Sequence, residues 1–556
     1  MTEVRRVTQG AQTTPIVKVV GQRSRWKYGD ERKPPQSTDR LVNINLSNAG
    51  IAATRRGRDQ YNTTSLAEAG IGLIQQTFAD GTDMRLVCTL TKVYYDDGTT
   101  RTNVTGSAVT LGALTKEDRI RHAYINDTLY VTAGVGEVWK KDATITSPGG
   151  DITELFPGGH SSPTEFESCK DLVSHSGVLV ALHTKESGSW YPTRIRWSDV
   201  DRRTFVPDPD TWAENSRFEV VGGGAAIVGG VDNFSTLFIF KEDGIYPGRI
   251  AYDTGFIEFR LDDRNIMRGI QPLARNSFIA HPDFVWGIAR SGAFIVVPGG
   301  NGFEYKFVTQ DIQDQWDEAL SAGRLKYAVS YLREKDKQVR TLLSSNTNTS
   351  GHDLELVWNW ETGDVWLDVL NDEINYAAPI ETGNIEYDWL VSETDYVYLG
   401  NTDDDDDGTA IEWEIRMAPN DLGYPNREKK ILNFRTLYST RTDVVQGSSC
   451  TLDLIRNQGA LPTISKTVSV DTVYLWDTQG LTWDSGLQWP AESPAEATNL
   501  INRTSELISP RWTGSTPQAI IGYVAEFIPL EAVVIGVALK ALYEAQNTLL
   551  ALAQFT

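Results

Sequence analysis

The sequence predicts a mainly β protein: a β-propeller with insertions, one or more additional β-rich domains, and a C-terminal helix. Between residues 177 and 367 one unit recurs: an apolar strand, a tight turn containing glycine, and a second apolar strand carrying an aromatic residue. Repeated antiparallel hairpins over so long a stretch favour a propeller, because radial repetition leaves only short strand edges exposed. A β-sandwich or a chain of small β domains would give the same local pattern.

Four hairpins carry this prediction. The clearest copy spans residues 284–297 and turns at Gly292, and further copies turn at Gly136, Gly244 and Gly363. Glycine relieves the steric penalty of a positive φ in a short loop, and the β-branched and aromatic residues on either side suit a half-buried pleated surface. The glycines are unevenly spaced, which indicates insertions between the blades.

Changes of composition along the chain divide it into predicted parts. These are an extended N-terminal arm at residues 1–40, the propeller at 41–400, an acidic loop at 401–409, a β-rich platform domain at 410–530 and a C-terminal helix at 531–556. A helical excursion is expected around residues 310–325, where Gln, Asp, Glu, Ala and Leu replace the β formers. Several domains are expected in 556 residues, because a single core stops growing near about 250–300 residues.

The charge balance restricts how the chain could meet nucleic acid. The formal net charge is −22, from 52 basic and 74 acidic side chains. Tight DNA binding draws on Lys and Arg, which release counterions from phosphates, so this balance argues against a sequence-reading DNA binder. It is compatible with a surface that DNA slides past, because a mildly repelling wall keeps water and counterions between itself and the duplex.

Cysteine usage and hydropathy indicate where the chain is made. Cys88, Cys169 and Cys450 are odd in number and far apart, which favours synthesis in a reducing cytoplasm over a disulfide framework. The first residues lack the apolar run of a signal peptide, and no stretch approaches about 18 consecutive apolar residues. We therefore expect no membrane insertion.

No motif nominates a catalytic, cofactor-binding or metal-binding residue, so we expect neither an enzyme nor a cofactor. No pair among the six histidines has the i, i+4 spacing of a helical zinc site. Only His175 and His183 have an even separation that could place them on one face of a strand. The glycines at 222–224 and 229–230 resemble a phosphate loop, but Ile227 stands where a third glycine belongs, which indicates a turn or bulge.

Two charged clusters have several interpretations. One is the acidic run Asp403, Asp404, Asp405, Asp406 and Asp407, whose adjacent carboxylates repel one another and are expected to stay in water. A solvated loop, a repulsive patch or lumen wall, and a divalent-cation site all fit this run. The other is the basic segment 55–58, which we interpret as a turn with local ion pairs.

The C-terminal segment has apolar residues at helical spacing. They are Val534, Val537, Ala538, Ala541, Leu542, Leu549 and Leu552. Such a stripe on a terminal helix must be covered, so the sequence predicts a partner-contact helix.

Several segments, taken in order, resemble the tail nozzle proteins of short-tailed phages, also called tail tubular protein B, and related propeller-bearing tail hub or stabilisation proteins. They are Leu41–Leu46 leading through Gly50 to Arg55–Gly57, Arg194–Val200 with Trp212, Gly229–Gly230 with Leu237–Tyr246, Leu422–Asn426 with Lys429–Lys430, and Gly522–Leu530. The acidic run and the helical C-terminal tail depart from the family pattern.

This resemblance implies a structural protein of the virion tail, assembled in the host cytoplasm. The implied state is a homohexameric ring below the tail adaptor ring, with tail fibres or spikes as further partners. Double-stranded DNA would pass without sequence specificity through the enclosed channel when the genome is ejected. The resemblance implies no enzymatic chemistry.

Two other functions remain open at the level of sequence. A receptor- or glycan-binding tail protein could stack sugars on Trp476, Trp483 and Trp489. A propeller glycoside hydrolase is suggested by residues 477–483, which resemble the Asp-box turn of sialidase-like propellers with one extra residue before the glycine. Hydrolysis needs two carboxyl groups that converge across a cleft, and the sequence places no such pair.

Overall fold

The chain folds into two β-rich units, which the computed structural model defines as Arg55–Ile411 and as Met1–Thr54 together with Glu412–Thr556. The structure describes residues 4–7, 12–14, 17–18, 38–46, 51–106, 111, 114–115, 117–142, 150–155, 166–200, 207–208, 210–220, 224–253, 256–300, 302–383, 385–393, 396–422, 428–438, 449–469, 495–505 and 507–533.

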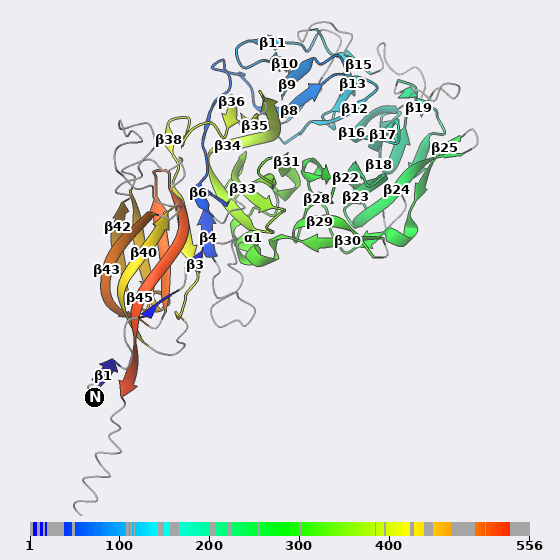
Figure 1. The fold of residues 1–556 in the computed structure, drawn as a ribbon. Coiled ribbons are helices and arrows are strands. Elements are labelled where there is room, and N and C mark those ends of the chain that lie inside the picture. The colour runs from blue at the N-terminus through cyan, green and yellow to red at the C-terminus, as the bar shows by residue number, and fades with distance from the viewer. Residues whose placement is uncertain are drawn as a thin grey trace, which may run out of the picture. The chain divides into compact units, whose positions relative to one another are not determined.

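The first unit is a β-propeller whose described residues form seven antiparallel blades (Figure 1). In chain order the first five blades are β8–β11 (Gly70–Thr77, Asp83–Thr89, Val93–Asp96, Arg101–Asn103), β12–β15 (Arg121–Ile125, Thr128–Thr132, Trp139–Asp142, Thr153–Glu154), β16–β18 with β21 (Phe166–His175, Val178–Glu186, Ser189–Trp197, Arg217–Glu219), β22–β25 (Ile227–Asn233, Thr236–Lys241, Gly244–Asp253, Phe256–Leu261) and β27–β30 (Ile279–His281, Phe284–Ala289, Gly292–Gly299, Gly302–Phe307). Short strands β19 (Asp199–Val200), β20 (Pro207–Asp208) and β26 (Met267–Arg268) are additions to this pattern.

The last two blades share one long strand. The sixth blade is β31 (Val329–Arg333), β32 (Gln338–Leu343), β33 (His352–Asn359) and the first half of β34 (Val365–Thr382), and the seventh is the second half of β34, β35 (Ile385–Ser392), β36 (Val397–Gly400) and β7 (Arg58–Gln60). The outer strand of the last blade therefore comes from the start of the propeller sequence. This exchange joins the two ends of the ring through main-chain hydrogen bonds.

Apolar side chains pack every blade against its neighbour. Representative residues of the clusters that follow the ring are Leu86 with Leu129, Tyr130 with Leu172, Leu182 with Leu237, Phe240 with Phe294, Trp286 with Trp358, and Trp389 with Leu73. The last pair joins the seventh blade to the first, so the ring of cores is closed. This closed ring confirms the predicted propeller.

The predicted hairpins and helical excursion are confirmed. Gly292 pairs with Ala289 across the β28–β29 turn, and Gly244 pairs with Lys241 across the β23–β24 turn. The turns at Gly136 and Gly363 join β13 to β14 and β33 to β34. The helical elements are η3 (Thr309–Ile312), α1 (Gln313–Ala319) and η4 (Leu325–Tyr327) in the excursion, with η1 (Asp263–Asn265) and η2 (Arg275–Ser277) before it.

The predicted boundaries of the propeller need correction. It begins at Arg55 and not at residue 41, and it extends to Ile411 and not to residue 400. Residues 41–54 belong to the other unit because β4 (Thr38–Val42) pairs with β39 (Trp413–Met417). The acidic segment 401–409 belongs to the propeller, since β37 (Asp405–Asp406) pairs with β7 and with β38 (Thr409–Ala410).

The second unit contains two sheets. One orders β43 (Ala495–Ser505), β40 (Lys429–Tyr438), β45 (Ala519–Val533), β6 (Ala52–Thr54) and β5 (Ile44–Leu46), and the other orders β4, β39, β44 (Ile508–Gly514), β41 (Ser449–Arg456) and β42 (Leu461–Ser469), with η5 (Asn457–Gly459) before β42. The rings of Phe434 and Tyr523 from the first sheet lie near Trp512 from the second. The predicted β-rich platform is therefore two sheets that face each other through aromatic side chains.

The chain ends differ from their predictions. Parts of the predicted arm are strands β1 (Val4–Val7), β2 (Gln12–Thr13) and β3 (Val17–Lys18), which pair with β45 of the same chain. Residues 531–533 belong to β45 and not to a helix, because their main chain pairs with β1. The predicted contact residues from Val534 to Leu552 lie outside the described residues. No helix in the described part of the chain has the length and apolar character to cross a membrane.

Candidate functional site

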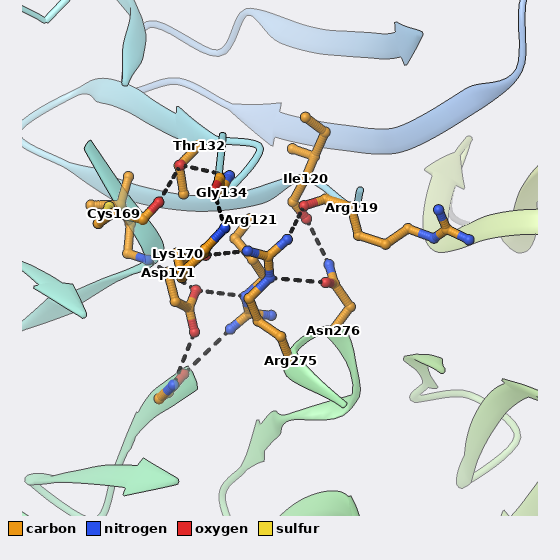
Figure 2. Close-up of polar contacts among 12 residues, drawn as sticks. Arg119, Ile120, Arg121, Thr132, Gly134, Cys169, Lys170, Asp171, Arg275 and Asn276 are labelled. Atoms are coloured by element: carbon orange, nitrogen blue, oxygen red, sulfur yellow. Dashed lines mark hydrogen bonds and ion pairs between the residues drawn. The ribbon is translucent and has the colours of Figure 1, made fainter. Parts of the chain in front are cut away.

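Polar side chains that meet between the inner strands of the propeller form the first candidate site (Figure 2). Arg121 begins β12 and Arg119 lies just before it, Lys170 and Asp171 lie on β16, and Arg275 begins η2. The inner strands of a propeller lie side by side around its axis, so residues distant in sequence converge there. These five residues are termed the axial cluster.

Arg275 binds main-chain carbonyl groups from two blades. Its Nη1 donates to the carbonyl oxygen of Lys170 at 2.6 Å, and its Nη2 donates to that of Arg119 at 2.6 Å. The neighbouring Gly134 has φ +77°, and a Cβ at that position would overlap the Arg275 guanidinium. Glycine is thus required there both by backbone conformation and by space. Arg275 fastens the segments that lead into β12 and along β16.

Asp171 is the fully buried carboxylate of the axial cluster. Its Oδ1 accepts a hydrogen bond from Arg121 Nε at 2.8 Å, and its Oδ2 accepts one from the main-chain N–H of Gly230 at 2.9 Å. A Cβ on Gly229 would lie 2.7 Å from the same Oδ2. The glycine pair is the predicted bulge, because the register of β22 shifts between Ile227 and Gly229. It brings β22 close to the buried carboxylate.

Amide side chains extend these contacts around the axis. Asn276 Nδ2 donates to the carbonyl oxygen of Ile120 at 2.7 Å, and Arg119 Nη2 donates to Asn375 Oδ1 at 3.2 Å. Asn375 Nδ2 in turn donates to the carbonyl oxygen of Gly70 at 2.9 Å in the first blade. Hydrogen-bonded side chains therefore occupy the space between the inner strands, and the axis is a polar core.

A second site lies where the ring closes, and it joins the two charged clusters that the sequence kept apart. Arg55 Nη1 and Nη2 donate to Asp406 Oδ1 and Oδ2 at 2.9 and 2.6 Å, a bidentate geometry. Arg58 pairs with Asp372 at 2.8 Å, and Asn371 Nδ2 donates to Asp406 Oδ2 at 3.0 Å. These five residues are termed the closure cluster.

The expectation that the whole acidic run stays in water is wrong for Asp406. Its side chain is buried, because two arginines offset its charge, whereas Asp403, Asp404 and Asp407 are exposed and Asp405 is half-buried. That the exposed carboxylates form a repulsive patch or line a channel stays a prediction.

Main-chain contacts hold the acidic segment against the basic one. The N–H of Gly57 donates to the carbonyl oxygen of Asp403 at 2.6 Å, and the N–H of Asn401 donates to the carbonyl oxygen of Gly57 at 2.8 Å. A Cβ on Gly57 would overlap the carbonyl group of Asp405. The Arg-x-Gly segment therefore holds the acidic hairpin against β7.

The closure cluster is expected to weaken in acid. Burial raises the pKa of Asp406, but the hydrogen bond from Arg55 and the charges of Arg55 and Arg58 outweigh burial, so the pKa is lowered overall. A carboxyl group with a depressed folded-state pKa stabilises the fold above its ordinary pKa of about 4, and this contribution is lost as the pH falls through the folded-state value.

The measurement is the urea midpoint of the propeller between pH 7 and pH 3 for the wild type and for Asp406→Asn. We expect the difference between the two proteins to shrink as the pH falls below about 4, because protonation removes the charge that the variant lacks. A difference that is the same at both ends of the range would contradict this role for Asp406.

A third arrangement has the connectivity of a serine–histidine–aspartate relay. His175 Nδ1 lies 2.9 Å from Asp232 Oδ1, and Ser176 Oγ lies 3.2 Å from His175 Nε2. The main-chain N–H of Ile250 also donates to that Nε2 at 3.1 Å, which fixes the proton on Nδ1. A general base needs a free lone pair, and here the N–H of Ile250 occupies the lone pair of His175 Nε2. We therefore interpret the relay as a structural contact at the tip of the β16–β17 hairpin.

The even spacing of His175 and His183 does not bring them together. His175 lies on β16, and His183 lies on the next strand, β17, at a bulge where its φ is +53°. The sequence signal for the His175 relay was the adjacent His-Ser-Gly at a hairpin turn. Its partner Asp232 lies in another blade and could not have been found from spacing.

The strand of the Arg194–Val200 segment carries a buried ion network. Glu186 on β17 is buried, and its Oε2 lies 2.9 Å from Arg194 Nη1 and 3.8 Å from Arg196 Nη1. Both arginines lie on β18, so the contacts join neighbouring strands of one blade. The Arg194–Val200 segment therefore helps to hold β18 against β17.

Other predicted site residues are not placed. Trp476, Trp483 and Trp489, and the Asp-box-like segment 477–483, lie outside the described residues. Within the described ranges, no group of three or more His, Cys, Asp or Glu side chains is arranged to hold a metal ion.

Comparisons with known proteins match solved structures but no protein family. No protein-family model and no curated protein matches this chain. Among solved structures, BBS1N in complex with ARL6DN is 12% identical over 63% of this chain and 99% of that chain, with a TM-score of 0.37. The WD40 domain of Neurospora crassa Pan2 is 9% identical over 63% of this chain and 96% of that chain, with a TM-score of 0.36. Because these TM-scores are low, the propeller assignment rests on the closed ring of sheets.

Proposed function

We propose that this chain is a structural component of a phage tail, a nozzle subunit that forms a ring below the tail adaptor and encloses the path of the ejected genome. The observation that carries the proposal is the ordered series of phage-like segments from Leu41 to Leu530. The series has members in both β-rich units, as expected if the resemblance concerns the whole architecture.

The interior of the propeller bears on where the DNA path would lie. Hydrogen-bonded side chains of the axial cluster occupy the space between the inner strands, so each propeller is a wall element of the proposed ring. The channel would then be enclosed by several copies of the chain. The net charge of −22 per copy favours a wall that repels phosphates and does not hold the duplex.

The experiment is single-particle electron microscopy of the purified chain, alone and mixed with the tail adaptor ring, with the rotational symmetry counted in end-on views. We expect a sixfold ring with an open central channel. A chain that stays monomeric or forms a trimer in the presence of the adaptor would overturn the proposal and favour receptor binding.

Deletion of residues 534–556 is expected to weaken assembly with the tail and leave the propeller folded, because the deleted segment contains the predicted apolar stripe. The cut leaves β45 complete to Val533 and so preserves its pairing with β1. Assembly is measured by cosedimentation with the adaptor ring, and folding by the near-ultraviolet circular dichroism of the buried tryptophans. Unchanged assembly would show that residues 534–556 do not contribute to the contact with the adaptor ring.

A further inference from the structure

The axial cluster carries an excess of positive charge inside a strongly acidic chain. Four of its members are cations, and its carboxylate, Asp171, is hydrogen-bonded to Arg121. A second carboxylate, Asp118, acts on Lys170 and Arg275 through its charge, and its Oδ2 accepts a hydrogen bond from the main-chain N–H of Thr115. Arg324 and Glu117 act on Arg119 through their charges as well. Five cations thus face three carboxylates, although the chain as a whole carries −22.

The cations of the cluster repel one another. The pKa of Lys170 is lowered by burial and by the positive charge of Arg275. Burial also lowers the pKa of Arg275, to which the charge of Arg121 adds. Arg275 is hydrogen-bonded to neutral carbonyl groups, and although the charge of Asp171 raises its pKa, the pKa is lowered overall. An anion close to these groups would be stabilised by all of them.

Lys170 is the member best placed to receive such an anion. Its half-buried ammonium donates to the carbonyl oxygen of Gly134 at 2.6 Å, and no other acceptor within the described residues reaches it, although an ammonium has three donors. The same Nζ lies 4.5 Å from the centre of the Trp190 ring, whose residue is 37% exposed. His183 lies edge-on to that ring at 5.6 Å. Lys170 therefore lies between the buried cations and an accessible aromatic side chain.

We propose that Lys170 and Trp190, supported by the charge of Arg275, form a binding site for a small oxyanion, a phosphate or carboxylate group. The ammonium would donate its remaining hydrogen bonds to the oxyanion, and Arg275 would act through its charge without leaving its present partners. Trp190 would cover one side of the bound group. This inference goes beyond the conduit function and does not depend on it.

The first test measures binding of inorganic phosphate to the full-length chain by isothermal titration calorimetry, with chloride used to hold the ionic strength constant. Acetate is titrated in parallel, to distinguish a phosphate site from a carboxylate site. We expect saturable binding of one equivalent of at least one of the two anions. Heats that do not saturate with either anion would overturn the proposal.

The second test compares two lysine variants of the same chain. Lys170→Gln keeps a donor for the Gly134 carbonyl group and removes the charge, and it is expected to weaken anion binding about tenfold or more. The control is Lys335→Gln, because Lys335 pairs with Glu381 on the exposed surface of a different blade. Equal affinity in both variants would overturn the assignment.

If Lys170→Gln does not fold, Trp190→Phe replaces it, because that ring is exposed and its truncation leaves the axial hydrogen bonds in place. We expect a measurable loss of affinity from Trp190→Phe. Wild-type affinity in this variant would exclude Trp190 from the site and overturn the proposal in its present form.

Discussion

Replacing Asp406 with alanine is expected to lower the free energy of unfolding of the propeller by about 3–5 kcal/mol, because it leaves a buried arginine without its counterion. Arg55 is 7% exposed and makes two hydrogen bonds to this carboxylate. Arg58 lies 4.0 Å away and would lose part of its compensation as well. The closure of the ring is therefore expected to be its most sensitive point.

The measurement is a urea titration of the full-length chain, in which the transition of the propeller is followed by tryptophan fluorescence. The matched control is Asp404→Ala, two positions earlier in the same acidic run, where the side chain is exposed. The control should change the free energy by no more than about 0.5 kcal/mol. Equal effects of the two substitutions would show that the Arg55 pair contributes nothing specific.

Replacing Asp171 with alanine is expected to lower the free energy of unfolding of the propeller by a similar amount, about 3–5 kcal/mol. The substitution removes the carboxylate that pairs with Arg121 and accepts from Gly230. It leaves four cations close together, and the buried main-chain N–H of Gly230 loses its acceptor. Asp171→Asn keeps one acceptor and the shape of the side chain, so it should destabilise less than alanine.

These variants are compared by the same urea titration, with Asp263→Ala as the control, since Asp263 lies exposed in η1 of the same unit. Raising the salt concentration should recover part of the loss in Asp171→Ala, because the lost term includes repulsion among cations that are not fully buried. A loss below about 1 kcal/mol for Asp171→Ala would mean that the axial cluster is not held together by its carboxylate.

The two clusters give the propeller different functions within the proposed ring. The closure cluster joins the first and last parts of the propeller sequence, so it fixes the ring of blades. The axial cluster ties the inner strands together and concentrates positive charge in the interior of a chain whose net charge is −22. A wall element for passing DNA would combine a rigid interior with a repelling surface.

Local pattern determined much of this architecture. Alternating apolar and aromatic residues around Gly244, Gly292 and Gly363 were sufficient to predict the hairpins, because a tight turn and the two-residue period of a strand are local properties. The helical excursion around α1 was predictable for the same reason, since helix propensity is set by neighbouring residues. The structural role rests mainly on the resemblance to tail nozzle proteins, and it stays a prediction.

Only the tertiary structure decided which distant residues meet. The sequence showed a basic segment at 55–58 and an acidic run at 403–407, and each looked like a solvated surface feature when taken alone. Ring closure places them in one buried cluster, where the charge of Arg55 makes the burial of Asp406 favourable. A run of like charges in the sequence therefore does not show that every residue of the run stays in water, because a segment from the other end of the propeller can supply the counterions. The axial cluster has the same origin. Arg121 and Asp171 lie in separate blades and Arg275 lies in η2 between two others, and they converge only because the inner strands surround one axis.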